Sequence, residues 1–97
     1  MFTVIETPTF QKQAEKFWTA SERHAFIDWI ASTPNAGTVI PGADGARKVR
    51  WMLKGKGKRG GVRVIYFNLN AEELVLLVAI YAKADRENLP SHEIDRS

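Results

Sequence analysis

Apolar residues recur along this chain first with a helical period and later with the alternation typical of β-strands. The stretch 2–6 is short and rich in β-branched residues, which predicts a first strand. Thr7-Pro8 is typical of a helix start, with threonine as N-cap and proline at the first helical position. A helix from Pro8 to Phe17 or Trp18 would bury one apolar face made of Phe10, Ala14, Phe17 and Trp18.

A second amphipathic stretch predicts another helix, with Ser21 as its N-cap and an end near Ala31. One to three residues separate the two helices, so we expect a helical hairpin. The apolar face of the second helix would consist of Ala25, Phe26, Trp29 and Ile30. We expect Trp18 and Trp29 to lie in the core and to pack against Trp51 of the sheet.

The period changes after a loop that reaches residue 45. In the stretch 47–53, Val49, Trp51 and Leu53 share one face of a strand, and Lys48, Arg50 and Met52 share the other. A glycine-rich turn separates this strand from the strand 62–69, and the stretch 74–81 is so apolar that it should be covered on both faces. The tail 82–97 is polar, and Pro90 argues against a long regular element there.

These elements predict a single α+β domain over residues 1–97, in the order β-α-α-β-β-β. We expect a small antiparallel sheet with both helices packed on one face. The pattern leaves open whether the first strand lies at an edge or beside the last strand.

Charge is distributed very unevenly along the sequence. Eight of the 14 basic residues lie between Arg47 and Arg63, and no acidic residue occurs between Asp44 and Glu72. The remainder has six basic and 11 acidic residues, so the net charge of +3 conceals a polarised molecule. Concentrated positive potential favours polyanions such as nucleic acid. The alternative is a lysine-rich loop that only aids solubility.

Composition excludes several other classes of protein. The chain has no cysteine, which excludes disulfides and thiolate metal sites and suits a reducing cytoplasm. The longest apolar run, 74–82, is far shorter than the roughly 20 residues that span a bilayer, and the N-terminus does not resemble a signal peptide. No spacing of His, Asp or Glu predicts a metal site, and we expect no cofactor and no membrane partner.

The strand cations are the strongest candidates for chemistry. Lys48 and Arg50 are two residues apart, so both side chains should project from the face that the helices leave open, roughly 6.5–7 Å apart along the strand. Arg63 is at the start of the partner strand, and it should share a face with Ile65 and Phe67. That phase nominally points its side chain inward, toward the core. Either a bulge near Gly60-Gly61 re-aims Arg63, or the residue lies beyond the end of the core.

Other residues are candidates for contacts with RNA. The loop carries Lys54, Lys56, Lys58 and Arg59 among glycines, which lets backbone and cations approach a phosphate, although the loop does not match the GxxxxGK[ST] pattern. Tyr66 and Tyr81 lie on strands near the basic face and could either stack on a base or pack in the core. His92 lies in the tail, which could bring it to the site.

Three stretches of the sequence carry a family resemblance: Arg47-Lys48-Val49-Arg50, Lys54-Gly55-Lys56-Gly57-Lys58-Arg59-Gly60-Gly61-Val62-Arg63-Val64-Ile65-Tyr66-Phe67, and Leu76–Lys83. Together they resemble the HigB-like branch of the RelE/ParE toxin superfamily. The resemblance covers residues 1–90. It implies the toxin of a type II toxin–antitoxin system that cleaves messenger RNA in the ribosomal A site without a metal. It also implies a cognate antitoxin as partner, HigA-like and with a helix-turn-helix domain.

The resemblance further implies roles for single residues. Lys48 and Arg50 match the paired strand cations of the ribonuclease toxins, Arg63 matches the arginine that opens the next strand, and Lys83 matches the basic residue after the last strand. This chain departs from the pattern at two positions. Ala84 stands where many relatives have a second arginine, and Pro90 stands where they have a tyrosine. Arg86 and His92 are the candidate substitutes.

These departures keep two other functions open. The same superfamily includes toxins that poison DNA gyrase without cutting RNA. A basic RNA-binding module without catalytic activity is the third possibility. Our leading hypothesis places Arg63 and Arg50 on the phosphate, Lys48 or Lys83 in proton transfer, and the glycine–lysine loop on the backbone of RNA or ribosome.

Overall fold

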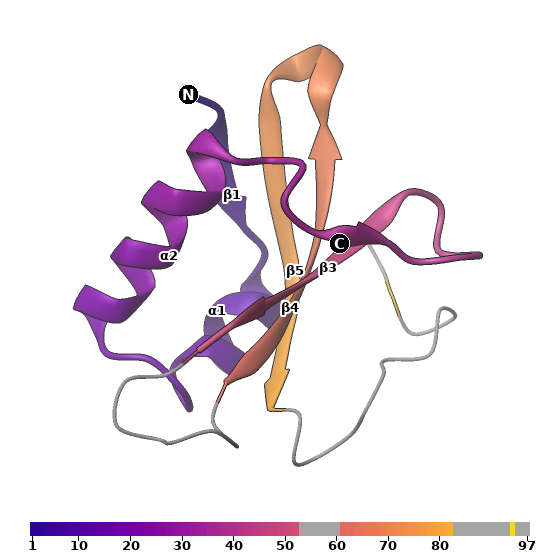
Figure 1. Cartoon of the computed structure of the whole chain (residues 1–97). Helices are drawn as coiled ribbons and strands as arrows, with labels where there is room; N and C mark the ends of the chain where they lie inside the picture. The colour runs from indigo at the N-terminus through magenta and orange to yellow at the C-terminus, as the bar shows by residue number, and fades with distance from the viewer. Residues whose placement is uncertain (53–60, 83–93, 95–97) are drawn as a thin grey trace.

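The computed structural model of the 97-residue chain describes residues 1–52, 61–82 and 94. It confirms the α+β fold and the predicted order of elements, and it adds one short strand that the sequence pattern did not reveal (Figure 1). The elements are β1 (Thr3–Glu6), α1 (Pro8–Ala14), α2 (Ala20–Ser32), β2 (Thr38–Val39), β3 (Ala46–Trp51), β4 (Val62–Leu69), the 3-10 turn η1 (Asn70–Glu72) and β5 (Leu74–Ala82).

The five strands form one sheet in the order β1-β5-β4-β3-β2. The first strand therefore lies both at an edge and beside the last strand. The sheet is mixed rather than wholly antiparallel, because β1 runs parallel to β5, with Ile5 opposite Leu76. Hairpin turns impose antiparallel pairing on neighbours in sequence, whereas most of the chain separates β1 from β5 and leaves their relative direction free.

Both helices pack on one face of the sheet, as predicted, around a core of aromatic side chains. Phe26 of α2 is fully buried, and its ring lies 5.2 Å from the rings of both Trp18 and Trp51. The Trp29 ring lies 5.1 Å from that of Trp51, so the expected packing of Trp29 against the sheet tryptophan is confirmed. The Trp18 ring instead lies against the rings of Phe10 and Phe26. The strand residues of this core are Val49, Val62, Val64, Tyr66, Val75, Leu77 and Ile80.

The opposite face of the sheet, which we call the open face, carries a second apolar cluster. Its buried members are Ala43, Ala46, Ile65, Phe67, Val78 and Tyr81, and we refer to them as the second cluster. An irregularity in the β4–β5 ladder lies between Ile65 and Tyr66, where Val78 is the extra residue on β5. Such a bulge changes the phase of the strand, so that Val78 and Tyr81 both reach the open face.

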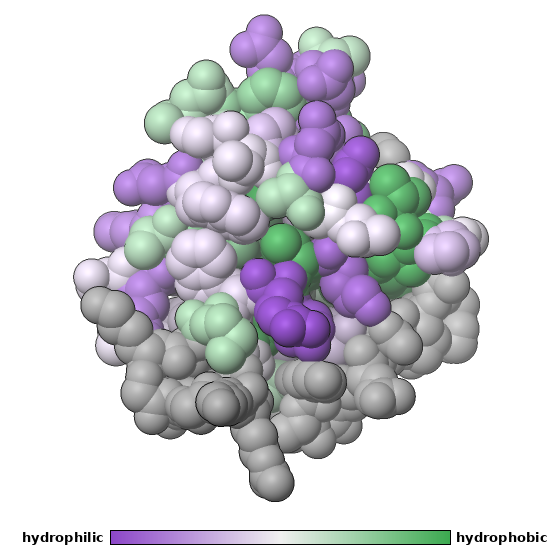
Figure 2. All heavy atoms as spheres, in the orientation of Figure 1, coloured by the Kyte–Doolittle hydropathy of each residue, from purple (hydrophilic) through white to green (hydrophobic). Residues whose placement is uncertain are grey.

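The surface of the molecule mixes apolar and polar residues. Among the described residues, the exposed large hydrophobic ones are Met1, Ile5 of β1, Val39 of β2 and Met52, and they are far apart in the sequence. On the side drawn in Figure 2, hydrophilic residues interrupt the hydrophobic surface. No helix in the described part of the chain is long and apolar enough to cross a membrane.

Local hydrogen bonds explain where the helices begin. The Thr7 hydroxyl accepts a bond from the Phe10 N–H at 3.2 Å, which confirms the predicted cap of α1. The second helix begins at a Thr19 cap and not at Ser21. Glu22 stands three residues after Thr19, and each side chain accepts a bond from the other's backbone N–H, so this capping box outcompetes Ser21. Helix α1 ends at Ala14, four residues before Trp18.

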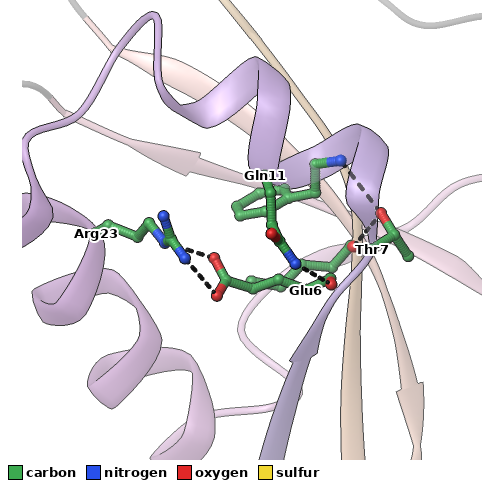
Figure 3. Close-up of polar contacts among 6 residues, drawn as sticks. Glu6, Thr7, Gln11 and Arg23 are labelled. Carbon is green, nitrogen blue, oxygen red and sulfur yellow. Dashed lines mark hydrogen bonds and ion pairs between the residues drawn. The ribbon is translucent and has the colours of Figure 1, made fainter.

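Polar contacts tie both helices to β1 and β5 (Figure 3). The Arg23 guanidinium of α2 forms an ion pair with Glu6 of β1, with 2.6 Å between Nε and Oε2 and 2.9 Å between a terminal nitrogen and Oε1. Gln11 of α1 donates to the Glu6 carbonyl at 2.9 Å, and the Thr7 hydroxyl donates to the Leu77 carbonyl at 2.9 Å. These contacts fix the helical hairpin on its face of the sheet.

Candidate nucleic-acid interface

The strand β3 presents two cations on the open face. Val49 and Trp51 pack into the helix-side core, so Lys48 and Arg50, which alternate with them, point the other way. Lys48 is half-buried and Arg50 is exposed. The predicted face of both residues is therefore confirmed.

Arg63 lies on the same open face, opposite Arg50 in the antiparallel register. Directly opposed positions in such a ladder have Cβ atoms about 4.5–5.5 Å apart. The expectation that Arg63 follows an inward phase was wrong, because Ile65 and Phe67 belong to the second cluster and not to the helix-side core. The β3–β4 ladder is regular at Arg63, so no bulge is needed to re-aim it. We call Lys48, Arg50 and Arg63 the cationic cluster.

The environment of Arg63 is unusual for a charged residue. Its side chain lies nine-tenths buried, with 9% exposed. Within residues 1–52, 61–82 and 94, neither Arg63 nor Arg50 forms an ion pair with a carboxylate, and the ion pair found there joins Arg23 to Glu6. Buried charges are ordinarily paired, and like charges directly opposite each other destabilise a sheet. Among the described residues, Arg50 and Arg63 therefore place two positive charges side by side without a carboxylate to offset them.

Tyr81 extends this row across a third strand. It is the partner of Arg63 in the β4–β5 register, so Arg50, Arg63 and Tyr81 lie side by side on β3, β4 and β5. Its ring is buried in the second cluster. The alternation of β5 did not reveal this position, because the bulge at Val78 shifts the phase of the strand.

Tyr66 does not belong to the interface, which corrects the RNA contact expected of it. Its side chain is fully buried in the helix-side core. The hydroxyl donates to the Pro34 carbonyl at 2.8 Å and accepts from the Gly37 N–H at 2.9 Å. Burial raises the pKa of the Tyr66 phenol, against the opposing effects of the Gly37 bond and the Arg47 charge. A ring in this position cannot stack on a base.

Arg47, the first cation of the basic run, also has a structural role. Its guanidinium donates to the Gly37 carbonyl at 2.7 Å and so holds the loop before β2 against β3. Gly37 is required there, because a Cβ atom would lie 2.8 Å from the Lys48 carbonyl oxygen and 2.9 Å from the Tyr66 hydroxyl. Arg47 and Tyr66 face each other in the ladder and position this loop together.

Several expected site residues lie outside the described residues. They are the catalytic candidate Lys83, the RNA-binding candidates Lys54, Lys56, Lys58, Arg59 and His92, the core candidate Leu53, and the positions Ala84, Arg86 and Pro90 at which the family pattern is lost or substituted. Among the residues that the structure describes, no group of three or more His, Cys, Asp or Glu side chains could hold a metal ion.

No family model matches the sequence. Three solved structures from E. coli resemble the fold, each 13% identical to this chain. A RelE toxin mutant in the free state superposes with a TM-score of 0.63 and covers 89% of this chain and 87% of its own. The intact RelBE toxin–antitoxin complex gives 0.60, with 82% and 94% covered, and the isolated RelE toxin gives 0.59, with 84% of each chain covered.

The chain has the RelE fold. At 13% identity this likeness concerns the path of the backbone. Function therefore has to be argued from the side chains, and above all from the cationic cluster.

Proposed function

We propose that this protein is the toxin of a type II toxin–antitoxin pair and that it cuts messenger RNA on the ribosome without a metal. The single observation that supports the nuclease is a buried arginine, Arg63, opposite Arg50 in the register and without a carboxylate partner among the described residues. The RelE fold supports the toxin class. The sequence stretch 54–67 supports the HigB-like branch, and cytoplasmic ribosomes would be its target.

Cleavage would proceed by attack of a ribose 2′-hydroxyl on the adjacent phosphate. The new 2′ O–P bond forms as the bond to the 5′ oxygen breaks, which leaves a cyclic phosphate and a 5′-hydroxyl. A base takes the proton of the 2′-hydroxyl, and an acid protonates the departing oxygen. The additional negative charge that develops on the phosphate in the transition state must also be stabilised.

The cationic cluster suits the last requirement best. Arginine presents a planar fork of donors that matches phosphate oxygens, and Arg50 and Arg63 together could contact one phosphodiester from two strands. The packing around Arg63 holds its guanidinium before substrate arrives, which favours transition-state stabilisation. We assign proton transfer to Lys48 or Lys83. Lys54, Lys56, Lys58, Arg59 and His92 would contact RNA or ribosome.

The proposed partner is a cognate antitoxin, by analogy with the RelBE toxin–antitoxin complex. We propose a HigA-like antitoxin with a helix-turn-helix domain. An acidic or apolar segment of it could mask the open face, where cations and the second cluster lie together. The helical hairpin is the alternative docking region.

Substitution of the two arginines tests the nuclease. We expect Arg63→Ala to abolish growth arrest and codon-phased breaks in messenger RNA, because removing one transition-state donor costs about 10²–10³ in rate. The exposed Arg50→Ala should show a smaller loss without a folding defect. Lys12→Ala, which removes an exposed cation from α1, is the matched control and should arrest growth like wild type. Full arrest by a folded Arg63→Ala protein would contradict the proposal.

The second candidate function is gyrase poisoning. It is favoured by Ala84 and Pro90, which stand where nuclease toxins often carry arginine and tyrosine. Intact transcripts together with DNA-damage signalling after induction would support it over the nuclease. RNA binding with a steep salt dependence but no growth arrest would instead identify a non-catalytic module.

A further inference from the structure

Tyr81 is a buried aromatic residue directly beside Arg63 on the open face. The two residues are register partners on β5 and β4, which places their Cβ atoms about 4.5–5.5 Å apart. Both are at least nine-tenths buried, with 8% of Tyr81 and 9% of Arg63 exposed. Because buried side chains are closely packed, two that are so near each other restrict each other's movement.

The other described neighbours of Arg63 on this face offer its side chain less support. Arg50, its partner on β3, is exposed and carries the same charge. Gly61, two positions earlier, has no side chain, and Ile65, two positions later on β4, is aliphatic. No carboxylate among the described residues pairs with Arg63. Its orientation therefore depends on packing, and the Tyr81 ring is the largest rigid group beside it.

We infer that Tyr81 is a positioning residue of the proposed nuclease. Its ring restricts the Arg63 side chain to the orientation in which the guanidinium binds the phosphate in the transition state. The inference rests on the proposed function. A long side chain that is already restricted loses less conformational entropy when it binds its ligand. Tyr81 thus acts on catalysis through Arg63 and not through a contact of its own with RNA.

The first experiment separates the ring of Tyr81 from its hydroxyl. For messenger RNA cleavage on ribosomes, we expect Tyr81→Leu to lower kcat about tenfold with little change in KM, since a small displacement of a catalytic group is costly. Tyr81→Phe keeps the ring and should retain most of the wild-type kcat. Phe67→Leu is the matched control and should cleave like wild type. It removes a ring from the same cluster, but the register partners of Phe67 are Ala46 and Leu76.

A double substitution tests whether Tyr81 acts through Arg63. In the Arg63→Ala background, Tyr81→Leu should cause no further loss of the residual kcat, because the side chain that Tyr81 positions is already absent. Multiplied losses would show that the two residues act independently and would overturn the inference. Wild-type cleavage by Tyr81→Leu, equal losses in Tyr81→Leu and Tyr81→Phe, or a loss that only follows a loss of folded protein would overturn it as well.

A second measurement reports on Arg63 without RNA. Burial slows the exchange of the arginine Nε–H with water, and the nuclear magnetic resonance signal that disappears in Arg63→Lys identifies this group. We expect its exchange to be several-fold faster in Tyr81→Leu and unchanged in Phe67→Leu. Unchanged exchange in Tyr81→Leu would refute the positioning role even if wild type cuts RNA. Faster exchange in a protein that cuts no RNA would instead refute the nuclease, and the role of Tyr81 in cleavage with it.

Discussion

The two faces of the sheet differ in how the charged side chains on them are paired by other described residues. On the helix side, the rings of Trp18, Trp29 and Trp51 surround Phe26, and the ion pair between Arg23 and Glu6 ties α2 to β1. On the open face, a smaller apolar cluster adjoins Arg50 and Arg63, which oppose each other in register. The Arg23 charge on the helix side is paired with Glu6, whereas Arg50 and Arg63 on the open face have no carboxylate partner among the described residues.

The two faces therefore use arginine in different ways. An arginine paired with a carboxylate stabilises the folded state, whereas an arginine directly opposite another arginine destabilises it. Proteins tolerate unfavourable local arrangements mainly at functional sites. Three measurements of stability test whether the two faces differ in this way.

Removal of the central ring of the helix side should have the largest effect. Phe26→Ala deletes a fully buried ring that contacts Trp18, Trp29 and Trp51. We expect a loss of about 3–5 kcal/mol in the free energy of unfolding, measured by denaturant titration. Phe67→Ala, in the second cluster, should cost less because that cluster is smaller. An equal or larger loss at Phe67 would show that the open face is a full core rather than a binding surface.

The buried hydroxyl of Tyr66 should have an intermediate effect that depends on pH. Tyr66→Phe leaves the Gly37 N–H and the Pro34 carbonyl without this partner, which should cost about 1–3 kcal/mol at neutral pH. Since the folded protein raises the pKa of this phenol, its contribution is intact below the unfolded value of about 10 and is lost as pH rises through the folded-state pKa.

The difference in unfolding free energy between wild type and Tyr66→Phe should therefore shrink above about pH 10. Lysine titration is common to both proteins and cancels in this difference. A difference that stays constant or grows with pH would contradict the role assigned to the buried phenol.

The smallest effect is also the most direct test of the comparison. Arg50→Gln removes one of two opposed cations on the open face and should stabilise the protein by about 0.2–1 kcal/mol, while impairing cleavage. Arg23→Gln makes the same chemical change on the helix side, where it removes an ion pair and should destabilise by about 0.2–1 kcal/mol. Thermal unfolding at low salt measures both. Shifts of the same sign would remove the distinction between the two faces.

Local pattern predicted most of the elements. The strand β4 has the predicted bounds, β5 extends one residue further, and the Thr7-Pro8 signal marks the start of α1. The short strand β2 escaped prediction because two residues are too few to show a period. Its pairing with β3 is what makes it a strand. The alternation of β3 also predicted correctly that Lys48 and Arg50 share the open face.

Tertiary contacts, and not the local sequence pattern, determine on which face of the sheet Arg63 lies. Val62, Val64 and Tyr66 alternate with Ile65, Phe67 and Leu69, so both faces of β4 are apolar and either could lie under the helices. A central strand covered on both faces carries no signal for its orientation. The register with β3, fixed by Val49 and Trp51 under the helices, settled it and brought Arg63 opposite Arg50.

Most of the elements, the charge polarity and the face of the β3 cations thus follow from the sequence alone, because they depend on neighbours within a few residues. The parallel pairing of β1 with β5, the core position of Tyr66 and the return of Ile94 to the open face follow only from the folded structure. Each of these depends on contacts between segments far apart in the chain, whose free energy comes from burial and which no local period encodes.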